Sequence, residues 1–301
     1  MEDEDTDTMT YNPTRCPGIN NLTAKIAADP KYVEHIAKIT TPLAKELTNV
    51  FGLPVPPTGW TSGIATKLYV LEAPCGLGCP PLGVCDECVC VVGVRSDCLM
   101  THRCHNFSLP AGVTPDLFAA VIEDDTWTYG FQLNYTGFVK LAVGTFMGEL
   151  LDNMKAMIAT QQPTSDVSRA PPPARKARKF WVYAGHDDGP VMPMMAALGA
   201  YHGVWSPYAT LIALELYNSS SGSLSEPMLV EPALRGVGTR AAASPAAAAD
   251  DMQYYVRAIV LGEEVKMPFC SAVLCPIAEF EQLVASLVPT EAECLGTTPV
   301  A

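Results

Sequence analysis

The stretch from Lys179 to Leu198 constrains the fold more than any other part of the sequence. An apolar run of aromatic and β-branched residues, Phe180 to Ala184, predicts a buried strand, and Pro193 to Leu198 predicts the first turns of a helix. His186 and Asp187 lie between the two. Open α/β sheets bind anions where strand ends meet helix N-termini, so this pair is a candidate site. The alternative interpretation is a tight Asp-Asp-Gly turn with an ordinary polar histidine at its edge.

Length and charge exclude several classes of protein. The chain has 301 residues, enough for one large or two ordinary domains with a core of their own. Its net charge of −13 disfavours nucleic acid as a partner and disfavours nonspecific adsorption to membranes. The longest uncharged run, 189–214, is interrupted by prolines and glycines, which is typical of core and not of a membrane span. These observations still allow a globular protein that binds small anions at a local site.

Cysteine content and the N-terminus point in different directions. The chain contains 11 cysteines and four acceptor triplets for N-linked glycosylation, which favour an oxidising, secretory environment. The acceptors are Asn21, Asn106, Asn134 and Asn218. The first residues are acidic, however, whereas a signal peptide would be basic and then apolar. We therefore expect a protein of the secretory pathway whose sequence lacks its beginning.

The first half of the chain has helical patterning. Apolar residues recur at helical spacing through Leu22 to Phe51, and Asp29-Pro30 predicts that two helices form there. Thr114-Pro115-Asp116 predicts a helix start, with a break expected at Asp124 to Trp127. The apolar spacing from Phe138 to Ile158 predicts a helix more clearly than any other stretch does. This half is therefore expected to be mainly helical.

Seven cysteines gather between Cys75 and Cys104. Cys85-x-x-Cys88 has the spacing of a zinc knuckle, with His102 and His105 nearby, so a metal site is one interpretation. The other, which we favour, is a disulfide-stapled insertion, in keeping with the secretory character of the rest. An odd total leaves at least one thiol free or paired between chains.

The second half of the chain has α/β patterning. It follows a basic, proline-rich linker, and its elements are expected as strands at 209–217 and 254–261 and an amphipathic helix at 276–287. A short strand is expected at 228–230. The alanine-rich stretch 236–251 is of low complexity and is expected to have little order.

Several motifs in this order resemble the histidine acid phosphatases, the branch of the histidine phosphatase superfamily that includes the lysosomal and prostatic enzymes. They are Thr14-Arg15-Cys16-Pro17, Tyr183-Ala184-Gly185-His186-Asp187, Trp205-Ser206-Pro207-Tyr208-Ala209 leading to Glu215-Leu216-Tyr217, Tyr255-Val256-Arg257, and Cys270-x4-Cys275-Pro276-x3-Phe280. The resemblance implies an αβα sandwich with a helical cap. It divides the chain into an acidic lead (1–15), a helical cap (16–165) with a cysteine-rich insertion (75–104), a linker (166–178), and the C-terminal half of the α/β core (179–301).

The resemblance also implies roles for individual residues. The family transfers a phosphoryl group to a histidine, and water then hydrolyses the phosphohistidine. His186 is similar to the family's second, phosphate-contacting histidine, and Asp187 to the general acid that protonates the leaving oxygen. Two disulfides are implied, Cys16–Cys294 and Cys270–Cys275. No cofactor or metal is implied, and the expected ligand is a phosphomonoester or inorganic phosphate.

The sequence departs from the family at the nucleophile. The family carries it in an Arg-His-Gly-x-Arg-x-Pro motif near its N-terminus, and none of the five histidines has that context. Asp188 also stands where the family commonly has threonine, which adds negative charge beside an anion site. We therefore expect the C-terminal portion of such a phosphatase, without its first strands and inactive alone. The alternatives are a catalytically inactive surface or secreted glycoprotein of the same fold, and a metal-binding module built on the cysteine cluster.

Overall fold

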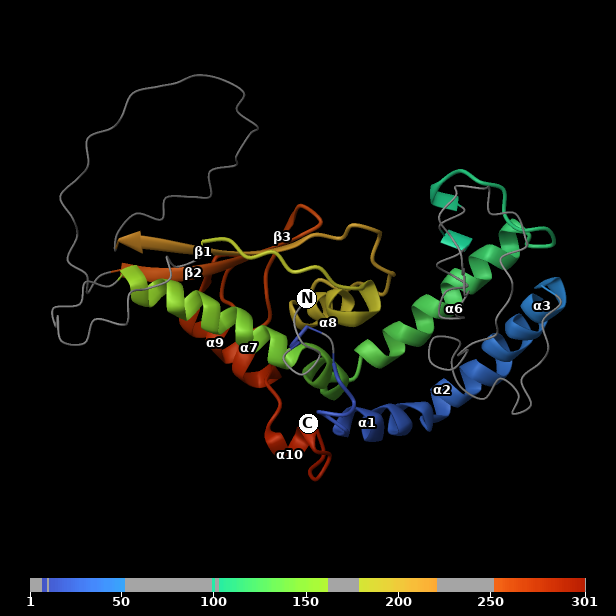
Figure 1. Cartoon of the computed structure of the whole chain (residues 1–301), viewed down its shortest axis with the longest axis horizontal. Helices are drawn as coiled ribbons and strands as arrows, with labels where there is room; N and C mark the ends of the chain where they lie inside the picture. Colours follow the sequence, from blue (N-terminus) through green and yellow to red (C-terminus); the bar gives the residue numbers. More distant parts are fainter. Residues whose placement is uncertain are drawn as a thin grey trace, which may run out of the picture. The chain divides into compact units, whose positions relative to one another are not determined.

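The computed structural model describes residues 7–9, 11–51, 99–100, 103–161, 179–220 and 252–300. The chain forms two compact units (Figure 1). We call Met1–Tyr11, Ala142–Tyr201 and Ser206–Pro289 the sheet unit, and Asn12–Leu141, His202–Trp205 and Thr290–Ala301 the helical unit. Each unit contains segments that are distant in sequence, and each is described separately below.

The helical unit begins with a helical run that is divided where Asp29-Pro30 predicts. Helix α1 covers Gly18–Ala27, α2 covers Pro30–His35, the π-helical turn η1 covers Ile36–Thr40, and α3 covers Thr41–Phe51. The Asp29 carboxylate caps α2 by accepting the Lys31 backbone N–H at 2.8 Å, and Pro30 takes the first helical position, where its missing N–H costs nothing.

Helix α6, Pro115–Leu133, is longer than expected. It begins at the predicted start, and Thr114 caps it by accepting the Leu117 N–H at 3.1 Å. The predicted break at Asp124 to Trp127 is wrong, because the helix continues through both acidic residues. Asp124 and Asp125 are both buried, and Asp124 accepts hydrogen bonds from two side chains of other helical segments. Tertiary partners outside the local sequence therefore keep this region helical.

The core of the helical unit lies between α3 and α6. Its buried members are Leu43, Leu47, Leu99, Val113, Leu117 and Val121. The residues from α3 and from α6 are each spaced by four, so each helix contributes one stripe along its length. The short C-terminal helix α10, Glu291–Cys294, belongs to the same unit.

Helix α7, Thr136–Gln161, contains the helix predicted at 138–158 and is the longest helix described. Its residues from Ala142 onward belong to the sheet unit. Gly144 permits a close approach of the chain at Leu287, since a Cβ at Gly144 would lie 1.9 Å from the Leu287 carbonyl oxygen. Any side chain at this position would force the two segments apart.

The sheet is antiparallel and open. Strands β1 (Ile212–Ser220) and β2 (Met252–Val260) pair along their whole length, with Ile212 opposite Val260. Two short strands, β3 (Glu263–Val265) and β4 (Cys275–Pro276), also pair with β2. The strands predicted at 209–217 and 254–261 are thus present with shifted ends. The stretches predicted at 228–230 and 236–251 lie outside the described residues.

The sheet has one apolar face. On β2, Val256, Ala258 and Val260 are buried, while the residues between them are partly exposed. Helix α9, Ile277–Leu287, packs beside β2 and β4 and buries Phe280, Leu283 and Val284. Figure 1 shows α7 and α9 running beside each other, and a Lys155–Glu281 ion pair of 3.1 Å joins them. Alternation along the strand therefore decides which face the helices cover.

The segment Phe180 to Ala184 differs from its prediction. It is extended but belongs to no strand among the described residues. Trp181 and Tyr183 are half-buried, whereas Phe180 and Val182 are 80% and 75% exposed. The alternation of a strand is therefore present without a ladder partner in the part of the chain that the structure describes.

Other expectations cannot be compared with the structure. The zinc-knuckle pair Cys85 and Cys88, most of the 75–104 insertion and the 166–178 linker lie outside the described residues. Cys104 is described; it is exposed and in no disulfide with another described cysteine. Among the described helices, none is long and apolar enough to cross a membrane.

Candidate functional site

His186 and Asp187 lie where the extended segment turns into a helix. His186 is the last extended residue and precedes the π-helical turn η3 (Asp187–Val191), which leads directly into α8 (Met192–Ala197). The Val191 N–H donates to the His186 carbonyl at 3.4 Å, and the Asp188 N–H donates to the Asp187 carboxylate at 2.9 Å. The chain therefore turns into a helix at the predicted place, but from an extended segment and not from the predicted strand, with the acidic pair in the first turn.

Tyr183 anchors the extended segment to α7. Its hydroxyl donates to Glu149 Oε1 at 2.9 Å and accepts from Asn153 Nδ2 at 3.0 Å. Its ring packs edge-on against Phe146, with the ring centroids 5.0 Å apart. Thr8 donates to the second oxygen of Glu149. The side chain three residues before His186 is thus fixed by both polar and aromatic contacts.

Gly185 is required by close packing at the same junction. A Cβ at this position would lie 2.3 Å from Pro190 Cγ, closer than nonbonded carbon atoms can come. Pro190 is buried, so it has little room to move away. The turn therefore folds back against the backbone immediately before His186.

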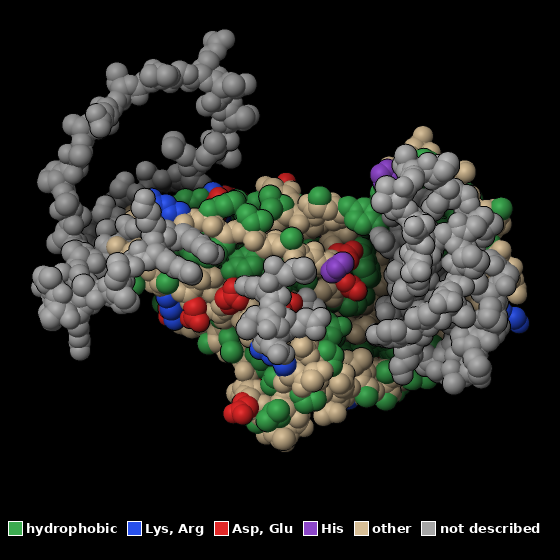
Figure 2. All heavy atoms as spheres, viewed as in Figure 1, with side chains coloured by type: hydrophobic (Ala, Val, Ile, Leu, Met, Phe, Trp, Pro, Cys, Tyr) green, Lys and Arg blue, Asp and Glu red, His purple; other side chains and the backbone are tan. Residues whose placement is uncertain are grey.

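The junction carries clustered negative charge. His186 is exposed and Asp187 is half-buried. Partial desolvation of its carboxyl group, followed by the charge of neighbouring Asp187, raises the pKa of Asp188, while His186 opposes the shift. Ionisation of Asp188 is therefore disfavoured where an anion is expected to bind. Acidic side chains appear at several places on the face drawn in Figure 2, in keeping with the net charge of −13.

One described arginine, Arg257, belongs to the sheet unit and is already engaged. Its Nη2 lies 2.6 Å from Glu215 Oε2, and its Nη1 lies 2.7 Å from Glu264 Oε1. The guanidinium also lies over the Tyr217 ring, 5.1 Å from the centroid. Among the described residues, this unit therefore offers no uncommitted arginine to an oxyanion.

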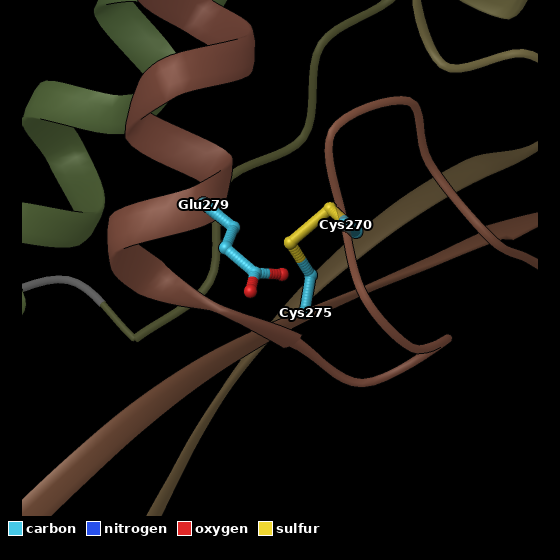
Figure 3. A group of neighbouring side chains, drawn as sticks. All are labelled: Cys270, Cys275 and Glu279. Carbon is cyan, nitrogen blue, oxygen red and sulfur yellow. A yellow bond between two sulfur atoms is a disulfide. The ribbon is translucent and has the colours of Figure 1, made fainter.

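Cys270, Cys275 and Glu279 form the one group of described side chains with the proximity of a metal site. Figure 3 shows the two sulfur atoms bonded to each other and the Glu279 carboxylate beside them. A disulfide sulfur is not a thiolate ligand, and Glu279 Oε2 already accepts the Ser271 N–H at 2.6 Å and its hydroxyl at 2.9 Å. This group fastens the loop that precedes α9.

The helical unit contains a histidine–carboxylate pair that the sequence did not reveal. His35 Nε2 lies 2.7 Å from Asp124 Oδ1, and the Thr40 hydroxyl donates to the same oxygen at 2.7 Å. The His35 ring stacks on Trp127, with centroids 3.6 Å apart and planes inclined by 9°. The two residues are 89 positions apart, so only the pairing of α2 and η1 with α6 brings them together.

The long-range disulfide closes the same unit. Cys16 and Cys294 are bonded, as are Cys270 and Cys275, so both expected pairings are present. Beside Cys294, Glu293 and Thr290 form a capping box, and Lys140 Nζ lies 2.7 Å from Glu293 Oε1. The hydrogen bond from Lys140, assisted by those from Thr290, lowers the pKa of Glu293 to about 2.

The described part of the chain is mixed α/β, with an exposed histidine and an adjacent aspartate where an extended segment meets a helix, and comparison with known proteins finds relatives that are named as acid phosphatases. The chain is a homologue of the histidine acid phosphatases. It is 27% identical to Counting factor 60 of Dictyostelium discoideum over 292 residues, which cover 96% of this chain and 51% of that protein.

Two further relatives carry phosphatase names. Rat prostatic acid phosphatase is 27% identical over 210 residues, covering 67% of this chain and 44% of that protein. Bovine lysophosphatidic acid phosphatase type 6 is 34% identical over 113 residues, covering 36% of this chain and 24% of that protein. No family model matches the chain. The chain thus spans about half the length, or less, of these relatives.

Proposed function

We propose that this chain carries the proton-donor side of an acid phosphatase-type site. In this proposal His186 contacts the phosphoryl group of a phosphomonoester and Asp187 protonates the leaving oxygen. An alkoxide leaves slowly unless it is protonated, so a carboxylic acid beside it lowers the barrier and favours acidic pH. The observation that carries the proposal is the position of this pair at an extended-to-helix junction, in a chain homologous to acid phosphatases.

The nucleophile and the phosphate-binding arginines are proposed to come from a further polypeptide segment. No histidine of the printed sequence lies in an Arg-His-Gly-x-Arg-x-Pro context. The arginine described in the sheet unit, Arg257, is held by two carboxylates. The exposed side chains of Phe180 and Val182 lie on one face of the extended segment, and in this proposal the further segment packs on that face. The chain alone is accordingly expected to bind phosphate without hydrolysing its esters.

Binding of inorganic phosphate to the purified chain tests this role. Phosphate should shift the imidazole resonances of His186 in an NMR titration, and His186→Gln should abolish the effect while leaving the other histidine signals in place. Hydrolysis of an aryl phosphate at acidic pH should be undetectable. Turnover that Asp187→Asn abolishes would instead reveal a nucleophile within this chain, and absence of any phosphate effect at His186 would remove the proposed contact.

The second candidate is a binding protein of the same fold that never acts as an enzyme. Asp188 favours it, because a second carboxylate beside Asp187 opposes tight binding of a phosphate dianion. The discriminating experiment adds a polypeptide with the missing motif to this chain. Acid phosphatase activity that depends on Asp187 would support the enzyme, whereas a stable complex without activity would support the binding protein.

Passage through the secretory pathway is part of the proposal; all four acceptor asparagines are exposed, and they differ in local structure. Asn106 is exposed in a turn with φ of 57°, and Asn134 is exposed at the end of α6. Asn21 lies within α1, and its Nδ2 is 2.5 Å from where a Cβ on Gly296 would stand. Asn218 is exposed in β1. We expect glycans on Asn106 and Asn134.

Secretion from a eukaryotic host behind an added signal peptide tests that expectation. Each of Asn106→Gln and Asn134→Gln should remove one glycosidase-sensitive mobility step, and Asn21→Gln should remove none. A secreted chain with no such step would contradict the assignment.

A further inference from the structure

We propose that one face of α7 sets the position of His186 and Asp187 through the Tyr183 hydroxyl, so that Tyr183, Glu149 and Asn153 are positioning residues of the candidate site. The proposal rests on the proposed function, in that it assigns the support of that same site. His186 is exposed and Asp187 is half-buried, so the order of this pair depends on contacts that neighbouring residues make.

The supporting residues of α7 share one face. Glu149 follows Phe146 by three residues, and Asn153 follows Glu149 by four. This spacing places the three side chains one above another along a helix. All three contact the Tyr183 side chain: Phe146 through its ring, Glu149 as acceptor and Asn153 as donor. A rigid helix with three contacts to one side chain fixes that side chain better than loop neighbours could.

The hydrogen bonds leave the hydroxyl one orientation. The Tyr183 oxygen accepts from Asn153 while its proton points to Glu149 Oε1, and Glu149 Oε2 is occupied by the Thr8 hydroxyl. Each atom in this chain of bonds thus has a defined role, and a phenylalanine at 183 would break the chain at its centre. A network of this kind orders the groups it contains more than a single bond would.

The backbone between Tyr183 and His186 is short and extended. Tyr183 and His186 are three residues apart in extended chain, about 10 Å at full stretch. Gly185, which lies between them, is packed so tightly on Pro190 that it has no space for a Cβ. Contact with Pro190 ties the backbone at Gly185 to the turn, so we expect a displacement at Tyr183 to reach His186.

Tyr183→Phe tests the proposal, and Tyr217→Phe is the matched control. The Tyr217 hydroxyl also donates to a carboxylate of the same unit, Glu215 at 2.6 Å, but lies on the sheet. We expect Tyr183→Phe to weaken inorganic phosphate binding at His186 about tenfold, with little change in the unfolding temperature. Tyr217→Phe should bind as the unchanged chain does.

Two variants of Glu149 test whether its hydrogen bond to Tyr183 positions His186 or only stabilises the fold in general. Glu149→Gln keeps an oxygen that accepts the Tyr183 proton and should retain most of the binding, whereas Glu149→Ala should lose as much as Tyr183→Phe. NMR relaxation of the backbone at residues 184–188, measured without phosphate, should show increased motion in Tyr183→Phe but not in Tyr217→Phe. Unchanged relaxation and unchanged phosphate affinity in Tyr183→Phe would overturn the inference. If the unchanged chain binds no phosphate, the proposed function fails, while the relaxation measurement still decides the anchoring role.

Discussion

Two histidines of this chain each precede a π-helical turn but lie in opposite environments. His35 ends α2 and is followed by the π-helical turn η1, and His186 ends an extended segment and is followed by the π-helical turn η3. The His35 side chain is 14% exposed, bonded to a carboxylate of α6 and stacked on Trp127. His186 is exposed and has its acidic neighbours in the chain that immediately follows it. Burial and pairing therefore distinguish a histidine that holds helices together from one that can meet a ligand.

The carboxylates of the two regions differ in the same way. The side chain of Asp124 has no exposed surface, and its Oδ1 receives two hydrogen bonds from distant residues. The Asp187 carboxylate accepts the backbone N–H of the next residue, a bond that holds only a local turn. Loss of the first should cost folding stability, and loss of the second should cost binding.

The largest expected effect is that of Asp124→Ala. Removing this buried carboxylate leaves His35 Nε2 and the Thr40 hydroxyl without their acceptor and opens a cavity, at a cost of about 3 kcal/mol. Asp187→Ala should change the unfolding free energy by less than about 0.5 kcal/mol. Urea titrations of both variants measure the difference. Equal costs would contradict the distinction between the two regions.

Acid should destabilise the helical unit through Glu293. Because its folded-state pKa is lowered to about 2 from 4.5, its contribution is present above pH 4.5 and is lost as pH falls from there toward 2. The expected loss is about 2 kcal/mol, less than the full pKa shift implies because water partly screens the Lys140–Glu293 pair. Unfolding free energies at several pH values measure it, and Glu293→Gln should remove this part of the pH dependence. A variant with the same acid profile as the unchanged chain would argue that the Lys140 pair contributes nothing.

Asp188 should respond to pH with the opposite sign. Its pKa is raised, so its ionisation costs stability as pH rises from the ordinary value of 3.8 through the folded value. Asp188→Asn should therefore stabilise the chain slightly at neutral pH. It should also tighten phosphate binding at His186 about fivefold, by removing a like charge from the site. Calorimetric titration with phosphate at neutral pH measures the change, and weaker binding would mean that Asp188 helps to hold the anion.

Much of the fold follows from patterns within the sequence, and the exceptions share a physical cause. Asp29-Pro30 marks a helix boundary because both residues act on the backbone locally, and the structure divides the helices there. Asp124 looks like a break for the same local reason, yet remains helical because His35 and Thr40 supply partners from far along the chain. Phe180 to Ala184 has the composition of a strand but no ladder partner among the described residues. Local chemistry was predictable, whereas long-range pairing was not.

The candidate site also has features that the sequence predicted and features that it did not. His186 and Asp187 are adjacent in sequence, so their proximity needed no fold, and the two disulfides followed from the family resemblance. The support from α7 was hidden, because Glu149 and Tyr183 are 34 residues apart and neither stands out in composition. Nothing in the spacing of the sequence connects that helix face with the junction.

The smallest expected effect on folding is that of His186→Gln. An exposed imidazole contributes little to packing, so the unfolding free energy should change by less than about 0.5 kcal/mol. His35→Gln, the matched change, removes a ring stacked on Trp127 and a bond to a buried carboxylate, and should cost about 2 kcal/mol. Thermal and urea unfolding of the pair measure the two costs, while the phosphate titration should fail for His186→Gln alone. If His186→Gln proved the more destabilising of the two, His186 would be a structural residue. That result would contradict its proposed role in binding phosphate.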